Sequence, residues 1–261
     1  MGAILYHGQP NGPSFSVLAA LAESGLAIET RSIDLLAGER HTIPGLAEPL
    51  ARDMGLEGEG PVLVADGEAM TDAVFLAQYF DEAAGGCGLQ PADPYAHWEM
   101  MMWCRQLTER LAPAAACLGT LAHAQPALAA LGGDAFAALA ANIASEDLRA
   151  RWQDLHDGAF DTAKLADSKA KVAQFAQRTE DRLADGRDWL MGDFSIADFE
   201  TYGWMAGMRA LEPEAFAGKP HLTAWFARIE ARPATQAALA HATVADPSAA
   251  WAPGPEINRW G

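Results

Sequence analysis

Ser14 is the residue whose type and position best suit chemistry on an anion. It follows a break rich in Gly, Gln, Pro and Asn and precedes apolar residues at helical spacing, so it is predicted to be the N-cap of a helix. A hydroxyl there lies beside the first-turn amides and the positive end of the helix dipole, which together stabilise a negative charge. Ser14 could also serve only to cap its own helix, and the two roles are compatible. His7, Asn11 and Ser16 are the nearby alternatives.

The three cysteines do not suggest a metal or disulfide site. Cys87, Cys104 and Cys117 are an odd number without Cys-x-x-Cys spacing, so neither a disulfide framework nor a zinc site is indicated and no metal is expected. We expect reduced thiols. All three lie beyond the first predicted helix, which disfavours a thiol-dependent reductase or peroxidase with its cysteine at the start of that helix.

A second candidate site is apolar. Trp98, Met101, Met102 and Trp103 lie at the beginning of a long predicted helix. Stripes of this kind usually belong to a core. Their rings and thioethers would nevertheless give an aromatic ligand polarizable walls to stack against.

The elements that position these residues fall into two groups. The first 84 residues are predicted to follow the order β, α, β, α, β, β, α, with Asp66-Gly67 as a type I′ hairpin turn and Thr71 capping the last helix. The predicted strands are 3–6, 27–35, 61–65 and 68–70, and the helix between the second and third strands is 45–54.

The rest of the chain carries almost no strand pattern. Helices are predicted from residue 98 onward and over 126–151, 162–183, 196–210 and 220–231. We therefore expect an α/β domain over residues 1–84, an all-α domain over 92–240 and an irregular tail over 241–261 that is docked by Trp251 and Trp260.

Composition excludes several classes of function. Eighteen Lys and Arg against 35 Asp and Glu give a formal charge of -17, which repels nucleic acid and anionic lipid. No apolar run approaches the roughly 20 residues of a membrane span. The chain does not open with the pattern of a secretory signal, so a cytoplasmic protein is expected.

Local motifs resemble the glutathione transferase family. Residues 61–74, PVLVADGEAMTDAV, resemble the Pro-x-Leu-x-x-Asp-Gly-x-x-Leu-Thr-Glu-Ser segment of that family's thioredoxin-like domain. Ser195-Ile196-Ala197-Asp198 resembles the N-capping box of the buried helix in its all-helical C-terminal domain, and residues 220–233 resemble its tail. Together these matches span residues 4–240, and their order and spacing carry more weight than any one of them. The resemblance implies a thioredoxin-like N-terminal domain followed by an all-α C-terminal domain.

Within the family, the chain is most similar to the bacterial β-aryl etherases. The features shared with them are Leu5-Tyr6 with Ser14 eight residues after Tyr6, a long insertion after the first C-domain helix, and Arg151-Trp152 leading to Gly158-Ala159-Phe160. This subgroup cleaves the β-O-4 ethers of lignin-derived aromatics, and its members occur as pairs of unlike subunits.

The resemblance implies glutathione as co-substrate and assigns roles to particular residues. Ser14 would stabilise the glutathione thiolate, whose sulfur has an ordinary pKa near ~8.5. Gly60, Pro61 and Val62 would present backbone to the peptide, with a cis bond before Pro61. Asp72-Ala73, at a helix start, would hold the γ-glutamyl end, Asp72 by pairing with its ammonium group. Two departures from the family are Gly60, where an apolar β-branched residue is common, and Ala73, which lacks a hydroxyl.

Residues 36–60 would supply a cation for the glycyl carboxylate. Arg40, His41 and Arg52 are the candidates, and His41 aligns best by spacing. Glu57 and Glu59 would repel an anionic peptide, which is the main departure from the family pattern.

Two hypotheses follow. In the first, glutathione thiolate displaces a phenol from a small aromatic β-aryl ether held against Trp98, Met101 and Met102, in a homodimer or a heterodimer with a related chain. In the second, the chain is a catalytically silent subunit that supports an active sister chain in a heterodimer. Gly60, Ala73, Glu57 and Glu59 motivate the second.

Overall fold

The N-terminal part of the protein is built around a four-stranded mixed sheet. The structure is a computed structural model that describes residues 2–51 and 58–255. The strand order is β2-β1-β3-β4; β1 is parallel to β2 and antiparallel to β3, and β3 is antiparallel to β4. The strands are β1 (Ile4–His7), β2 (Glu29–Ser32), β3 (Val62–Ala65) and β4 (Glu68–Met70).

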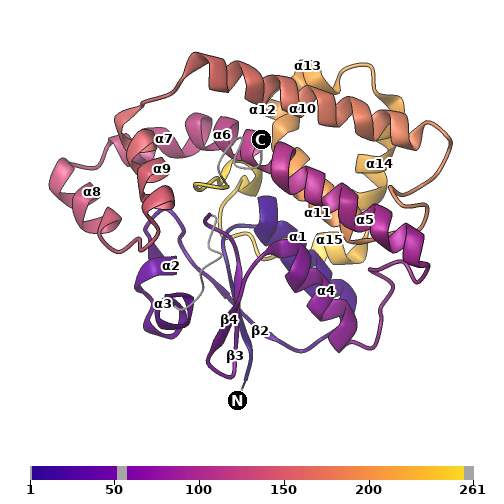
Figure 1. Cartoon of the computed structure of the whole chain (residues 1–261), viewed down its shortest axis with the longest axis horizontal. Helices are drawn as coiled ribbons and strands as arrows, with labels where there is room; N and C mark the ends of the chain where they lie inside the picture. Colours follow the sequence, from indigo (N-terminus) through magenta and orange to yellow (C-terminus); the bar gives the residue numbers. More distant parts are fainter. Residues whose placement is uncertain (1, 52–57, 256–261) are drawn as a thin grey trace.

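Helices cover both faces of this sheet because alternate side chains point to opposite sides. Leu5 and Leu63 pack in the main core with α1 (Gly12–Ser24) and α4 (Ala73–Ala83). Tyr6 and Val62 instead contact Leu46 and Leu50 of α3 (Pro44–Leu50), which follows the short α2 (Glu39–Thr42). Figure 1 shows the sheet between these two pairs of helices. The predicted thioredoxin-like arrangement is confirmed.

Three local predictions in this part need comment. Both residues of the Asp66-Gly67 turn have positive φ, 52° and 85°, as a type I′ hairpin requires. The predicted caps are wrong by a few residues: α1 begins at Gly12 after Asn11, so Ser14 lies inside its first turn, and Asp72 rather than Thr71 caps α4. The cis bond expected before Pro61 is also wrong, because residues 2–51 and 58–255 contain no cis peptide.

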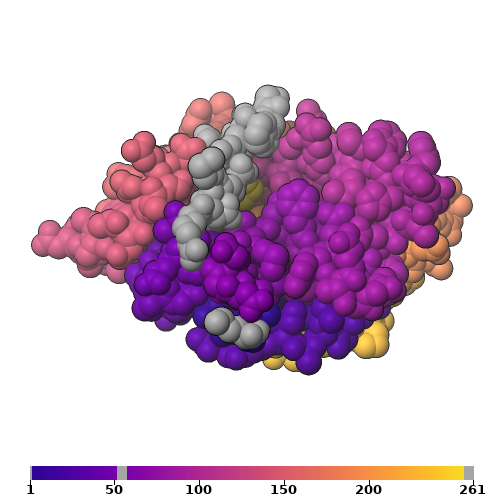
Figure 2. Space-filling model, turned by 60° about the horizontal axis from the view of Figure 1, so that its bottom comes forward, coloured from indigo at the N-terminus to yellow at the C-terminus, as the bar shows by residue number. Residues whose placement is uncertain are grey.

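The C-terminal part is all helical, as predicted. Its helix 162–183 has the predicted bounds, whereas the stretch predicted as helical over 126–151 is divided into three helices at Gly132-Gly133 and Ser145. The elements are α5 (Pro94–Gln106), η1 (Leu107–Leu111), α6 (Ala112–Gly119), η2 (Thr120–Ala124), α7 (Gln125–Ala129), α8 (Gly133–Ala140), α9 (Glu146–Asp157), α10 (Thr162–Leu183), α11 (Ile196–Met205), α12 (Met208–Leu211), α13 (Pro213–Phe216), α14 (Pro220–Glu230), α15 (Pro233–Leu239) and η3 (Pro247–Ala249). In Figure 2 the part around α8 and α9 protrudes at one end of the molecule.

Helix α11 joins the two parts. All ten of its residues are buried, and Ser195 and Asp198 form the capping box that the sequence predicts. Gly203 lies against α1, where a Cβ atom would come within 2.5 Å of the Gly12 carbonyl oxygen. Only glycine therefore permits this close approach of the two helices.

The tail after α15 returns to the N-terminal part. Gln9 and Thr243 exchange two hydrogen bonds, the Asn11 side chain donates to the Ala250 carbonyl, and the Glu59 amide donates to the Pro253 carbonyl at 2.8 Å. The side chain of Trp251 is buried, as predicted, while Trp260 lies outside the described residues. Within the described ranges, no helix combines the length and apolar character needed to cross a membrane.

Candidate active site between the two domains

A cavity of about 750 Å³ lies where the N-terminal and helical parts meet. Its walls come from the starts of α1 and α4, the segment before β3, the α5–η1 region, α11 and the tail. Ser14, Gly60, Pro61, Asp72, Ala73, Trp98, Met101 and Met102, which the sequence nominates separately, all line it. Residues far apart in the chain are thus brought to one hollow.

Ser14 is positioned by the first turn of α1. Its side chain is only 2% exposed, and the Gly8 amide donates to its Oγ at 3.0 Å. Because this bond uses Oγ as an acceptor, the Ser14 O–H remains available as a donor. The arrangement suits stabilisation of an anion at the end of the helix.

Asp72 is fixed by capping α4. Its carboxylate accepts from the amides of Val74 at 2.9 Å and Phe75 at 3.1 Å, and its backbone has φ 71°, an uncommon conformation for a residue other than glycine. Ala73 follows it on the cavity wall. Val62 is not on this wall, since its side chain lies in the core beneath α3.

The cation that α2 contributes to the cavity wall is Arg40. The Arg40 side chain is buried, and its Nε donates to the Gly60 carbonyl at 3.0 Å. His41, favoured by spacing, is absent from the wall; its Nε2 lies 2.7 Å from Glu59 Oε1, which also accepts from Trp152 Nε1. Glu59 is thus partly engaged by these partners. The predicted Arg52 and Glu57 lie outside the described residues.

One stripe of α5 faces the cavity and another faces the core. Trp98, 54% exposed, lies on the wall with Met101 and Met102, while Trp103 is buried and donates to Thr201 Oγ1 at 2.9 Å. Phe75 of α4 also lies on this wall. Trp204 of α11 and Trp251 of the tail extend the aromatic lining, with ring centroids 6.2 Å apart. The sequence singled out neither residue for this wall.

Known proteins resemble this chain in sequence and in fold. The family model "Glutathione S-transferase, C-terminal domain" matches residues 137–233. Protein LigF from Sphingobium sp. strain SYK-6 is 26% identical over 241 residues, 88% of this chain and 90% of LigF. The crystal structure of the beta-etherase LigF from that strain has a TM-score of 0.81, at 24% identity, covering 92% of this chain and 99% of LigF. Residues 137–233 thus match the C-terminal domain of glutathione S-transferases, and the chain has the glutathione transferase fold.

Other members of the superfamily match more loosely. Glutathione transferase F7 from Populus trichocarpa has a TM-score of 0.65 at 21% identity, covering 90% of this chain and 97% of its own. A maleylacetoacetate isomerase from Rhizobium meliloti is 37% identical over 91 residues, 35% of this chain and 40% of that protein. The fold of this chain is therefore shared well beyond LigF.

The cavity also contains a carboxyl group that the sequence reasoning missed. Glu200 of α11 is 2% exposed and lines the wall. Burial raises the pKa of Glu200 to about 8; the charge of Asp72 adds to the rise and a hydrogen bond with Ser16 opposes it. A glutamate in the middle of an otherwise apolar helix was the signal that could have revealed it.

The three cysteines are free thiols, as expected. Burial raises the pKa of the Cys104 thiol, and burial with a hydrogen bond to Asp81 raises the pKa of Cys87 to about 11. Burial also raises the pKa of Cys117. None of the three is a ready thiolate at neutral pH.

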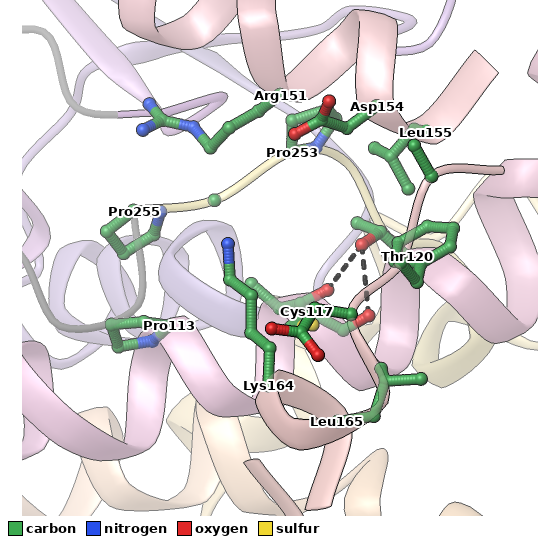
Figure 3. A pocket seen from close by; sticks show the side chains of 15 residues that line it. Pro113, Cys117, Thr120, Arg151, Asp154, Leu155, Lys164, Leu165, Pro253 and Pro255 are labelled. Carbon is green, nitrogen blue, oxygen red and sulfur yellow. Dashed lines mark hydrogen bonds between the residues drawn. The ribbon is translucent and has the colours of Figure 1, made fainter. Parts of the chain in front are cut away.

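A smaller hollow of about 70 Å³ adjoins the main cavity, and the two share Gly254 and Pro255. Pro253 and Pro255 of the tail border it opposite Cys117 and Thr120, with Arg151 and Lys164 beside them (Figure 3). The tail therefore separates the two hollows.

Proposed function

We propose that this protein cleaves β-aryl ether (β-O-4) bonds of lignin-derived aromatics by glutathione transfer. The observation that carries the proposal is one cavity in which an anion-stabilising helix start, with Ser14, faces a wall of Trp98, Met101 and Met102. The similarity over most of the chain to LigF, described as a beta-etherase, supports this choice among transferase reactions.

In the proposed reaction Ser14 and the first-turn amides of α1 stabilise the glutathione thiolate. The sulfur attacks the carbon that carries the aryloxy group, the C–S bond forms, and the C–O bond breaks. The phenolate that leaves takes up the proton lost by the thiol, so no redox change occurs. Asp72 pairs with the ammonium of the γ-glutamyl residue, and Arg40 replaces His41 as the cation for the peptide's carboxylate.

The proposal is tested by mixing the purified protein with glutathione and a β-aryl ether ketone and measuring phenol release. Ser14→Ala should lower kcat/KM by about ten- to a hundred-fold. This ratio corresponds to the free energy of one hydrogen bond to a charged group. Ser24→Ala, at the other end of α1, is the matched control and should retain activity. Absence of phenol release by the wild-type protein, alone and with a related chain, would contradict the enzymatic proposal.

A second candidate is the silent subunit of a heterodimer. It is favoured by the pairing of His41 with Glu59 and by the missing hydroxyl at Ala73, which reduce the groups available to a peptide. Phe75 and Tyr95 are 61% and 66% exposed, and they offer apolar surface to a partner. Calorimetry separates the two candidates, because micromolar to millimolar glutathione binding by the chain alone argues against a silent subunit.

A further inference from the structure

We propose that Glu200 and Asp72 together form a receptor for a primary ammonium group, which is the amino group at the γ-glutamyl end of glutathione. This inference rests on the proposed function and adds to it a binding residue from the helical domain. The role of Asp72 alone follows from the family resemblance, whereas that of Glu200 follows from the environment of its side chain.

The first observation is an oxygen without a partner. Glu200 Oε1 is buried and has no hydrogen-bond partner among the described residues, although the side chain borders a cavity large enough for a ligand. A buried oxygen in this state costs free energy until a donor reaches it. A donor that enters from the cavity would remove that cost.

The second observation is the convergence of carboxyl groups from two domains. Asp72 lies at the start of α4, and its negative charge acts on Glu200 of α11. The Ser16 hydroxyl of α1 forms a hydrogen bond with Glu200, and the charge of Glu200 acts on the buried Cys104 thiol of α5. A ligand that brings positive charge to this part of the wall would stabilise the ionised forms of both carboxyl groups.

A primary ammonium group matches this arrangement. It carries one positive charge and three N–H donors. One donor can reach the unpartnered oxygen of Glu200 and another can reach Asp72, whose position is fixed by two amides. Glu200 would thereby offset the hydroxyl that is missing at Ala73.

The test is isothermal titration of the full chain with S-methylglutathione and with its deamino analogue, which carries hydrogen in place of the ammonium group. The S-methyl group removes any contribution from thiol ionisation. Wild-type protein should bind the amine-bearing ligand more tightly. Glu200→Gln should weaken binding of S-methylglutathione by about ten- to a hundred-fold, as for charge-assisted hydrogen bonds, and leave binding of the deamino analogue unchanged.

Two further variants sharpen the test. Asp72→Asn keeps a good N-cap but removes the charge, so it should show the same ligand selectivity as Glu200→Gln. Glu109→Gln removes a negative charge from the same cavity wall, but Glu109 is already paired with Arg105, so both affinities should stay at their wild-type values.

Proton release provides a readout that a merely structural role would not change. Because its pKa is raised to about 8, Glu200 is largely protonated at neutral pH and must ionise to pair with an ammonium group. Titrations in two buffers of different ionisation enthalpy should show the release of nearly one proton by the wild type and of none by Glu200→Gln.

The outcomes separate the two proposals. If Glu200→Gln weakens both ligands equally, or if proton release is the same in the variant, the ammonium receptor is overturned while the glutathione site stands. If neither ligand binds the wild-type chain, both proposals fail. Binding of the deamino analogue also verifies that each variant is folded.

Discussion

Glu200 and Asp198 are two positions apart on α11, yet burial affects them to different extents. Burial raises the pKa of Asp198 to about 6, and hydrogen bonds from Trp225, Leu190 and Ser195 limit the rise. Glu200 has only the Ser16 hydrogen bond to oppose burial, and its pKa rises to about 8. At neutral pH, therefore, Asp198 is mostly ionised and Glu200 is mostly protonated.

This difference predicts a pH-dependent stability. The pKa of Glu200 in the folded protein lies above its ordinary value of 4.5, so the folded state binds more protons than the unfolded state between about 4.5 and 8. The contribution of Glu200 to stability is present in full at low pH and is lost as pH rises through this window, by up to roughly 1.4 kcal/mol per pH unit. Glu200→Gln should abolish that loss.

The measurement is urea unfolding of the wild type and Glu200→Gln at pH 5.5, 7 and 8.5. The variant should gain stability relative to the wild type as pH rises. Glu109→Gln, exposed enough to be solvated, should follow the wild-type profile. Parallel profiles for the wild type and Glu200→Gln would show that Glu200 titrates normally.

The choice between Arg40 and His41 shows where residue-level prediction from sequence ends. The two are consecutive residues of the four-residue helix α2. Successive side chains on a helix point about 100° apart, so one can reach the cavity while the other pairs with Glu59. The sequence restricted the candidate cations to residues 36–60. It could not decide between Arg40 and His41, because a short segment without apolar periodicity does not reveal which side chains point into the cavity.

At the scale of elements, the N-cap of α11 is a critical junction. Asp198 accepts from Trp225 Nε1 at 2.9 Å, from the Leu190 amide at 3.1 Å and from the Ser195 amide at 3.1 Å. It thus ties α11, α14 and the segment before α11 together. Because the site is fully buried, each donor that loses its acceptor costs free energy.

Asp198→Ala should lower the free energy of unfolding by about 3–5 kcal/mol, because it leaves the buried donors of Leu190, Ser195 and Trp225 without their acceptor. Asp198→Asn retains an acceptor oxygen and should cost less than half as much. Denaturant unfolding at pH 7 provides the comparison. Equal losses for the two variants would mean that charge, rather than hydrogen bonding, holds the junction.

The strongly patterned elements were predictable and the irregular turns were not. Strand β4 and helix α10 have the bounds that alternation and capping residues indicate. The π-helical turns η1 and η2 were missed, yet each ends shortly before a proline, Pro113 or Pro126. Proline cannot donate to the carbonyl four residues earlier and its ring crowds that carbonyl, so a widened turn lets the helical path continue.

At the scale of the whole molecule, the tail after α15 packs back against the N-terminal part. Its residues contact the N-terminal part through Gln9, Asn11 and Glu59, and they line both hollows. The aromatic residues of the tail predicted that it would dock. The position at which it docks depends on contacts with residues far away in the sequence, because Trp251 lies against Gly119 and Gly207.

Gly119 provides a direct test of this docking. A Cβ atom at position 119 would lie 2.2 Å from the indole ring of Trp251, a distance that the two groups cannot share. Gly119→Ala should therefore expel Trp251 and release the tail, even though alanine is intrinsically better than glycine in a helix by about 1 kcal/mol. Limited proteolysis followed by mass spectrometry should show earlier cleavage after residue 240 in the variant.

The release of the tail should also weaken binding of the aryl ether without weakening binding of the peptide. Because Trp251 belongs to the aromatic wall, its loss should raise KM for the aryl ether several-fold, while affinity for S-methylglutathione, held by Asp72 and its neighbours, should change little. Gly133→Ala is the matched control, since a Cβ atom there meets nothing within 4 Å. If Gly119→Ala and Gly133→Ala give the same cleavage pattern and the same KM, the tail is not a wall of the substrate site, and the aromatic lining must come from α4, α5 and α11.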